Sequence, residues 1–195
     1  ENFDIEGGLR TTLKNLDALN FRNRRGHLKK EDAISSLEEK YEIEIEDLNI
    51  MNNDAIHKPI LRNVKFRTED LVETIGDKSY LSPLLFLTTS VNPFKLEDRK
   101  FPVDFGVPFK NKTTVSIQIP NGYKVESVPE SSGLALSNNI GSFGYKVIPK
   151  GSKINILYQL QINQTIVSPE NYLELKEFFN RIVKKQTEKI VLIKN

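Results

Sequence analysis

The chain contains no cysteine and no tryptophan among its 195 residues. Without cysteine it can form neither a disulfide nor a thiol nucleophile, so cysteine-based catalysis is excluded for this chain. The missing disulfides do not define a compartment, because cytosolic and periplasmic proteins also lack them. A chain of this length buries roughly 70% of its unfolded surface, so it needs no disulfide or metal in order to fold.

An excess of one charge and a long apolar run are also missing. The 28 basic and 26 acidic residues leave a net charge of only +2, far from the basic excess typical of nucleic-acid binding. No apolar run approaches the ~20 residues of a membrane span, and residues 1–4 do not resemble a signal peptide. We therefore expect a folded domain that binds no nucleic acid and has no membrane span.

Motifs that carry catalysis or metal binding are missing as well. The sequence has no Gly-x-Ser-x-Gly elbow, no His-Glu-x-x-His pair and no glycine-rich phosphate loop. His27 and His57 lie far apart in polar surroundings and are interpreted as surface residues. Glu42, Glu44 and Glu46 could mimic the carboxylate pair of a glycosidase, but a solvated strand face is the favoured interpretation. We predict no catalytic, metal-binding or cofactor-binding residue, and no cofactor.

Residues 1–41 are predicted to form a short helical lead-in. Residues 9–16 fit a helix or a strand, whereas residues 31–41 have apolar side chains at helical spacing, which indicates an amphipathic helix. From residue 42 the apolar spacing changes to two, as in a strand. Because the apolar positions switch from odd to even numbers, we predict a β-bulge or a break between Ile45 and Leu48.

Residues 42–195 are predicted to form a mainly β (α+β) domain, an antiparallel β-sandwich with a packed C-terminal helix. Strict apolar alternation over residues 154–162, and shorter alternating runs separated by Gly, Pro and Asn, favour this class. Ser168 is a good N-cap and Pro169 suits the first helical position, which predicts a helix over residues 168–186 and then a terminal strand. The predicted buried face of this helix consists of Tyr172, Leu175, Phe179 and Ile182, and it is widened by Phe178 and Val183.

Several segments, taken in order, resemble a known family. They are Asn92–Lys95, Arg99–Gly106, Ile119–Pro129, Gly141–Phe143, Tyr172–Phe179 and Glu188–Leu192. In their order and spacing they resemble the domain of unknown function at the C-terminus of bacterial transglutaminase-like proteins, over about residues 7–195. In that family a papain-like transglutaminase core, which carries a catalytic Cys, His and Asp, precedes this domain.

The resemblance implies a non-catalytic accessory domain that positions or stabilises an upstream transglutaminase-like core or its protein substrate. Residues 1–41 would then continue from that core, which is absent from this chain. No member of the catalytic set maps onto this sequence, so no functional residue is carried over. The resemblance also implies a periplasmic or cell-envelope parent protein. The alternative function is an independent binding module for glycan or peptide, which a groove of exposed aromatic side chains would favour.

One apolar stretch is the candidate for docking against such a core. Residues 81–94 hold more apolar side chains than one strand face can bury, so we predict an exposed patch, with a central strand buried on both faces as the alternative. The next residues could dock through Arg99, or could form a stiff corner with Phe94, Phe101 and Phe105 in the core. The candidate docking residues are Leu84, Leu85, Phe86, Leu87, Asn92, Phe94 and Arg99.

Overall fold

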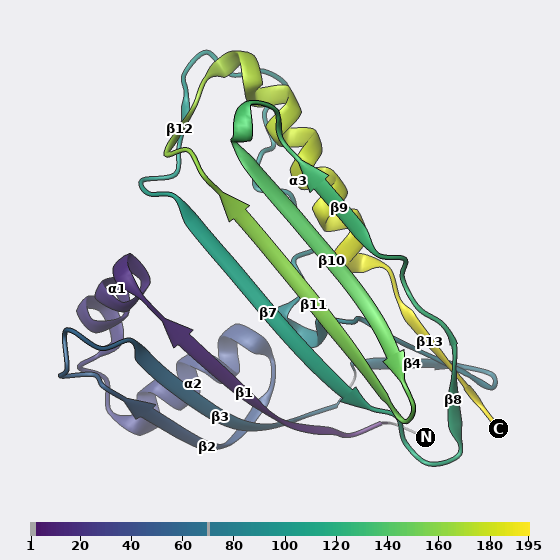
Figure 1. The fold of residues 1–195 in the computed structure, drawn as a ribbon. Helices are drawn as coiled ribbons and strands as arrows, with labels where there is room; N and C mark the ends of the chain where they lie inside the picture. Colours follow the sequence, from purple (N-terminus) through teal and green to yellow (C-terminus); the bar gives the residue numbers. More distant parts are fainter. Residues whose placement is uncertain (1–2, 70) are drawn as a thin grey trace. The chain divides into compact units, whose positions relative to one another are not determined.

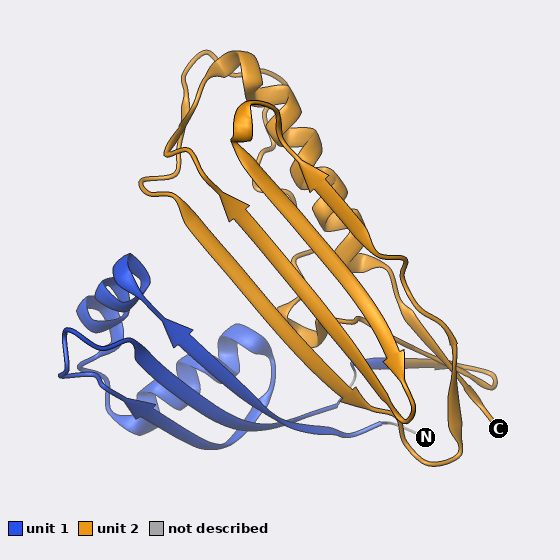
Figure 2. Cartoon of the chain, in the orientation of Figure 1, with its two compact units in different colours: residues 1–72 blue, residues 73–195 orange. Residues whose placement is uncertain are grey.

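A computed structural model describes residues 3–69 and 71–195, and the chain divides into two compact units, residues 1–72 and 73–195 (Figure 2). The predicted boundary after residue 41 differs from this division. Strand β1 (Ile5–Leu13) pairs along its whole length with β3 (Ile60–Thr68), and this long-range pairing keeps the intervening residues in unit 1. Within the described residues, no helix combines the length and the apolar character needed to cross a membrane.

Unit 1 is a three-stranded antiparallel sheet with two helices (Figure 1). The strand order is β1-β3-β2, where β2 spans Glu44–Met51. Helix α1 spans Asn15–Arg25. Residues 9–16, which fit a helix or a strand by sequence, therefore contain the end of β1 and the start of α1. The predicted amphipathic helix is confirmed as α2 (Lys30–Tyr41), which buries Leu37.

The predicted bulge in β2 is confirmed. Ile45 pairs with Phe66 and Asp47 pairs with the preceding residue, Lys65, so Glu46 is an extra residue without a partner in the pairing. An extra residue in one strand shifts the side chains that follow to the other face. Both Ile45 and Leu48 are therefore buried, at 7% and 4% exposure.

Arg22 of α1 fastens the loop between β2 and β3 to the helix. Its Nε donates to the carbonyl of Asn53 at 2.8 Å, and its Nη2 donates to the carbonyls of Asn52 and Ala55, both at 3.0 Å, and of Lys58 at 2.8 Å. Arg22 therefore has a structural role, because its guanidinium group joins the helix to this loop.

Replacing Arg22 by alanine is expected to lower the free energy of unfolding by about 2 kcal/mol, because carbonyl acceptors lose a charged donor. Arg22→Lys should recover only part of the loss, since an ammonium group lacks the planar fork. Urea denaturation measures both changes, with exposed Arg24→Ala as the matched control. Equal losses for Arg22→Ala and Arg24→Ala would contradict this role.

Unit 2 is built on a four-stranded antiparallel sheet of order β7-β11-β10-β9 (Figure 1). β10 and β11 form a hairpin with ten residue pairs, and its turn contains Gly151 with a φ of +59°, a conformation that glycine adopts readily. β11 is paired over its whole length on both sides. The strands are β7 (Phe109–Gln118), β9 (Ser132–Ala135), β10 (Gly141–Lys150) and β11 (Lys153–Ile162).

A second four-stranded sheet has the order β4-β5-β13-β8, and β6 pairs with β12. β8 (Tyr123–Ser127) follows the turn at Pro120–Gly122, yet it pairs with the terminal strand β13 and not with β7. β7 itself pairs along its whole length with β11. The bounds are β4 (Val72–Ile75), β5 (Lys78–Leu81), β6 (Val103–Asp104), β8 (Tyr123–Ser127), β12 (Ile166–Val167) and β13 (Ile190–Lys194).

Helix α3 (Tyr172–Thr187) runs along one face of the large sheet (Figure 1). The predicted C-terminal helix is confirmed, except that its first turn is the 3-10 helix η3 (Pro169–Asn171). Its buried face contains Phe178, at 5% exposure, whereas Phe179 is half-buried. Phe178 therefore takes the place predicted for Phe179. The remaining buried residues of α3 are Tyr172, Leu175, Ile182 and Gln186.

The fold is thus a β-rich α+β fold with antiparallel sheets, a packed C-terminal helix and a terminal strand, as predicted. It differs from a simple sandwich of two sheets in that α3 lies against the large sheet (Figure 1). The remaining short helices of unit 2 are η1 (Leu85–Leu87) and η2 (Ser137–Asn139).

Candidate functional site

The apolar run at Leu84–Leu87 forms neither an exposed strand nor a central one. Leu84 is buried, at 2% exposure, and Leu85, Phe86 and Leu87 are half-buried in η1. Leu85 has a φ of 53°, in the left-handed region that regular strands do not contain. The excess of apolar residues is therefore absorbed by a tight turn, and Leu84 cannot contribute to a docking surface in this fold.

The segment after this turn lies along α3 in the opposite direction. At one end, the backbone N–H of Thr89 donates to Oε1 of Gln186 at 3.0 Å. At the other end, the Tyr172 hydroxyl donates to the carbonyl of Leu96 at 2.9 Å. These two hydrogen bonds fix both ends of residues 89–96, which we call the anchored segment, and the chain bends at Val91 and Pro93 between them.

Asn92 is the central anchor of this segment. Its Nδ2 donates to the carbonyl of Lys176 at 2.9 Å and to Oδ1 of Asn180 at 2.6 Å, while its own Oδ1 accepts from the backbone N–H of Phe94 at 2.8 Å. The amide group thus joins the segment to α3 and shapes the turn at Phe94. Of the predicted docking residues, Asn92 has a structural role within unit 2.

Replacing Asn92 by alanine is expected to loosen the anchored segment and to lower the free energy of unfolding by about 1–2 kcal/mol, because three hydrogen bonds to a half-buried side chain are lost. Hydrogen exchange should accelerate at the Phe94 amide and stay unchanged on β11. Asn121→Ala, at an exposed turn, is the matched control. Unchanged exchange at Phe94 would show that Asn92 does not hold the segment.

Phe94 points inward and takes part in an aromatic cluster. Its ring lies 4.9 Å from that of Phe179, 6.1 Å from Tyr172 and 6.2 Å from Phe105, all in edge-to-face geometry, which favours aromatic pairs. The predicted stiff corner is therefore correct for Phe94 and Phe105, which are half-buried. It is wrong for Phe101, whose side chain is 78% exposed.

Exposed apolar side chains remain in this part of unit 2, and we call three of them, Leu96, Phe101 and Leu173, the docking surface. Phe101 is 78%, Leu173 is 63% and Leu96 is 59% exposed. Leu173 follows Tyr172, whose hydroxyl binds the Leu96 carbonyl, so both leucines lie at the start of α3. Arg99, predicted to dock, is half-buried and makes no hydrogen bond or ion pair with the described residues. Sequence reasoning missed Leu173, although its position off the apolar face of the helix is a usable signal.

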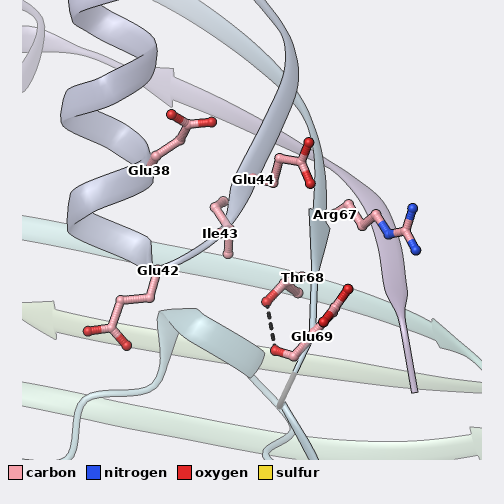
Figure 3. Close-up of a pocket in the computed structure, with 7 residues that line it drawn as sticks. All are labelled: Glu38, Glu42, Ile43, Glu44, Arg67, Thr68 and Glu69. Carbon is pink, nitrogen blue, oxygen red and sulfur yellow. Dashed lines mark hydrogen bonds between the residues drawn. The ribbon is translucent and has the colours of Figure 1, made fainter. Parts of the chain in front are cut away.

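A separate acidic pocket of about 520 Å³ lies in unit 1 (Figure 3). Glu38 uses Oε1 to accept the backbone N–H of Ile45 at 2.8 Å, so it has a structural role. Figure 3 shows the carboxylates of Glu38, Glu42 and Glu44 pointing in different directions. Within residues 3–69 and 71–195, no group of three or more potential ligands could hold a metal ion. The carboxylates therefore do not form a convergent acid–base or metal site.

Two further candidates of the sequence also lie in unit 1. His27 and His57 are both exposed, as expected of surface histidines. Glu42 ends α2 with a φ of 54° rather than lying on a strand, and Glu46 is the bulged residue. The three glutamates 42, 44 and 46 thus do not share one regular strand face, and the glycosidase interpretation has no geometric support.

The chain is thus a β-rich domain with an exposed apolar corner. Its described residues form no convergent catalytic site. Residues 77–192, more than half of the chain, match the family model described as "Domain of Unknown Function with solved-structure structure (DUF3858)", and the chain belongs to this family. A search of curated proteins gives no match. A crystal structure of a "putative protease" from Parabacteroides distasonis is similar, with 12% identity and a TM-score of 0.44 over 51% of this chain. The chain covers 19% of that protein.

Proposed function

We propose that this chain is a non-catalytic accessory domain that docks against the catalytic core of a transglutaminase-like protein and positions that core or its protein substrate. The observation that carries the proposal is the docking surface: Leu96, Phe101 and Leu173 are more than half exposed. Leu96 ends the segment that α3 holds in place, and Leu173 lies on α3 itself. Exposed apolar side chains on an ordered frame are typical of a binding surface.

The sequence supports the non-catalytic part of this proposal. A papain-like transamidase or hydrolase needs a cysteine nucleophile, and the chain has none. Purified chain should therefore neither incorporate amines nor cleave peptides above a heat-inactivated control. The resemblance to the C-terminal region of transglutaminase-like proteins supports the identity of the partner, in a periplasmic or cell-envelope parent protein.

The test is a calorimetric titration of this chain with the separately purified transglutaminase-like core of its family. Phe101→Asp and Leu96→Asp are each expected to weaken binding about 30-fold, because buried apolar anchors contribute about 2 kcal/mol or more. Ile75→Asp is the matched control, since Ile75 is 60% exposed on β4, away from this surface.

Two outcomes would contradict the proposal. Absence of binding by the unmodified chain would contradict the docking role. Wild-type affinity in both Phe101→Asp and Leu96→Asp would show that docking uses another surface. Thermal denaturation of each variant confirms that the fold is intact, because all three side chains are exposed and their replacement should not unfold the protein.

A further inference from the structure

The large sheet of unit 2 has one face that its own residues leave uncovered. The inner face carries buried residues such as Phe143, Tyr145 and Ile156. Because side chains alternate along a strand, the residues between them lie on the opposite face. This outer face consists of the even-numbered residues of β7 and β10 and the odd-numbered residues of β9 and β11. All of them are exposed or half-buried.

Charge is segregated on this outer face. The four strands together contain none of the 26 acidic residues of the chain and five of its 28 basic residues. The rest of the chain therefore has more acidic than basic residues, although the whole chain has a net charge of +2. All five basic residues are lysines whose side chains lie on the outer face: Lys110, Lys112, Lys146, Lys150 and Lys153.

The lysines follow a diagonal track across three strands. Lys110 and Lys112 lie at the start of β7, and Lys146 lies opposite Leu157 near the middle of β11. Lys150 and Lys153 pair at the hairpin end. With a rise of about 3.4 Å per residue, the track is about 27 Å long. None of the five ammonium groups forms a hydrogen bond or an ion pair with a described residue.

We propose that this outer face binds a carboxylate-bearing polysaccharide through charge and hydrogen bonds, because it has no aromatic side chain against which a neutral sugar ring could stack. The lysines supply positive charge for the carboxylates along an extended polymer, and the sheet holds these charges on a platform whose inner side is packed. Between the lysines lie amide and hydroxyl side chains, among them Thr114, Asn155 and Gln159. An amide both donates and accepts hydrogen bonds, which matches the hydroxyl groups of a sugar.

The composition of the outer face disfavours other anionic partners. Single-stranded nucleic acids are bound by stacking on aromatic side chains, and protein hot spots are rich in Trp, Tyr and Arg. The register places no aromatic residue and no arginine on this face. Its apolar residues of any size are Ile148, at 44% exposure, and Leu157, at 37%, too few for the apolar centre of a protein interface.

The experiment is a binding titration of the full chain with polygalacturonate, at two salt concentrations. We expect binding that weakens as salt rises, because exposed charges are screened, and no binding to the neutral methyl ester of the same polymer. The double variant Lys112→Gln/Lys146→Gln should bind about tenfold more weakly, since each surface lysine near an anionic partner contributes about 1 kcal/mol or less. The matched control, Lys14→Gln/Lys124→Gln, removes the same charge from exposed positions outside this sheet.

Three results would overturn the proposal. They are absence of binding to polygalacturonate, equal binding to its methyl ester, and wild-type affinity in the Lys112/Lys146 variant. Poly-glutamate and single-stranded DNA serve as competitors, and displacement of the polysaccharide by either at equal charge would also contradict the proposal, because the face would then bind any polyanion. The proposal does not depend on docking to a catalytic core, because none of these lysines belongs to the docking surface.

Discussion

Phe178→Ala is expected to lower the free energy of unfolding by about 3–5 kcal/mol, the range for a large aromatic side chain removed from a core. Phe178 is 5% exposed on α3, and its ring lies 5.7 Å from that of Phe179. Its loss leaves a cavity where α3 packs, and the two neighbouring core residues of the helix, Leu175 and Ile182, are themselves fully buried. Urea denaturation, followed by circular dichroism, measures the change.

Phe179→Ala is the internal comparison for this prediction. Phe179 is half-buried and its ring centroid lies 4.9 Å from that of Phe94, so its truncation removes less apolar area and leaves a site that solvent can reach. We expect a loss of about 1–2 kcal/mol. Equal losses in the two variants would contradict the assignment of Phe178, rather than Phe179, to the buried face of α3.

Alkaline pH is expected to destabilise the protein steeply, because two tyrosines ionise less readily in the folded chain. Burial raises the pKa of Tyr145 well above its usual value, and burial also raises the pKa of Tyr158 to about 12. Both unfolded side chains ionise near a pKa of about 10. Above about pH 10 the unfolded state therefore binds fewer protons than the native state, and stability falls as pH rises.

The slope is expected to reach at most about 1.4 kcal/mol per pH unit for each tyrosine, and thus about 2.8 kcal/mol per pH unit for both, within the window of about pH 10 to 12. Below about pH 10 this stability is fully present. Tyr145→Phe should halve the slope, and Tyr158→Phe should do the same. Denaturant melts at a series of pH values measure it. A flat profile up to pH 12 would show that neither tyrosine is protected from ionisation.

At neutral pH, Tyr145→Phe should stabilise the protein slightly or leave its stability unchanged. The Tyr145 hydroxyl is buried and has no hydrogen-bond partner among the described residues. A buried unsatisfied hydroxyl costs about 1 kcal/mol or more, and phenylalanine removes it while keeping the ring. The same variant thus separates the alkaline effect from the packing of the ring against Phe143, 6.2 Å away.

Local pattern determined most of the secondary structure. The switch of the apolar positions from odd to even numbers predicted the bulge between Ile45 and Leu48, since one extra residue lets a strand keep both side chains on one face. The apolar spacing after Pro169 likewise predicted α3 and three of its buried residues. It could not distinguish Phe178 from Phe179, because neighbouring positions lie only about 100° apart on a helix.

Pairing partners and surface exposure needed the tertiary structure. β8 follows a turn signal after β7 but pairs with β13, and that partner lies far along the chain. The docking surface likewise consists of other residues than those predicted from the sequence. The composition of Leu84–Leu87 shows only an apolar excess, whereas the left-handed turn at Leu85 and the hydrogen bonds of Asn92 to α3 decide which side chains turn inward.

The sequence by itself determined that this chain performs no cysteine chemistry, that it is rich in antiparallel strands, and where its C-terminal helix lies. These properties depend on residue types and on spacing along a few turns or strand positions. The tertiary structure alone decided the two-unit division after residue 72, the exposure of Phe101, and the gathering of five lysines on one sheet face. Each of these depends on contacts between residues far apart in the chain, which local spacing does not specify.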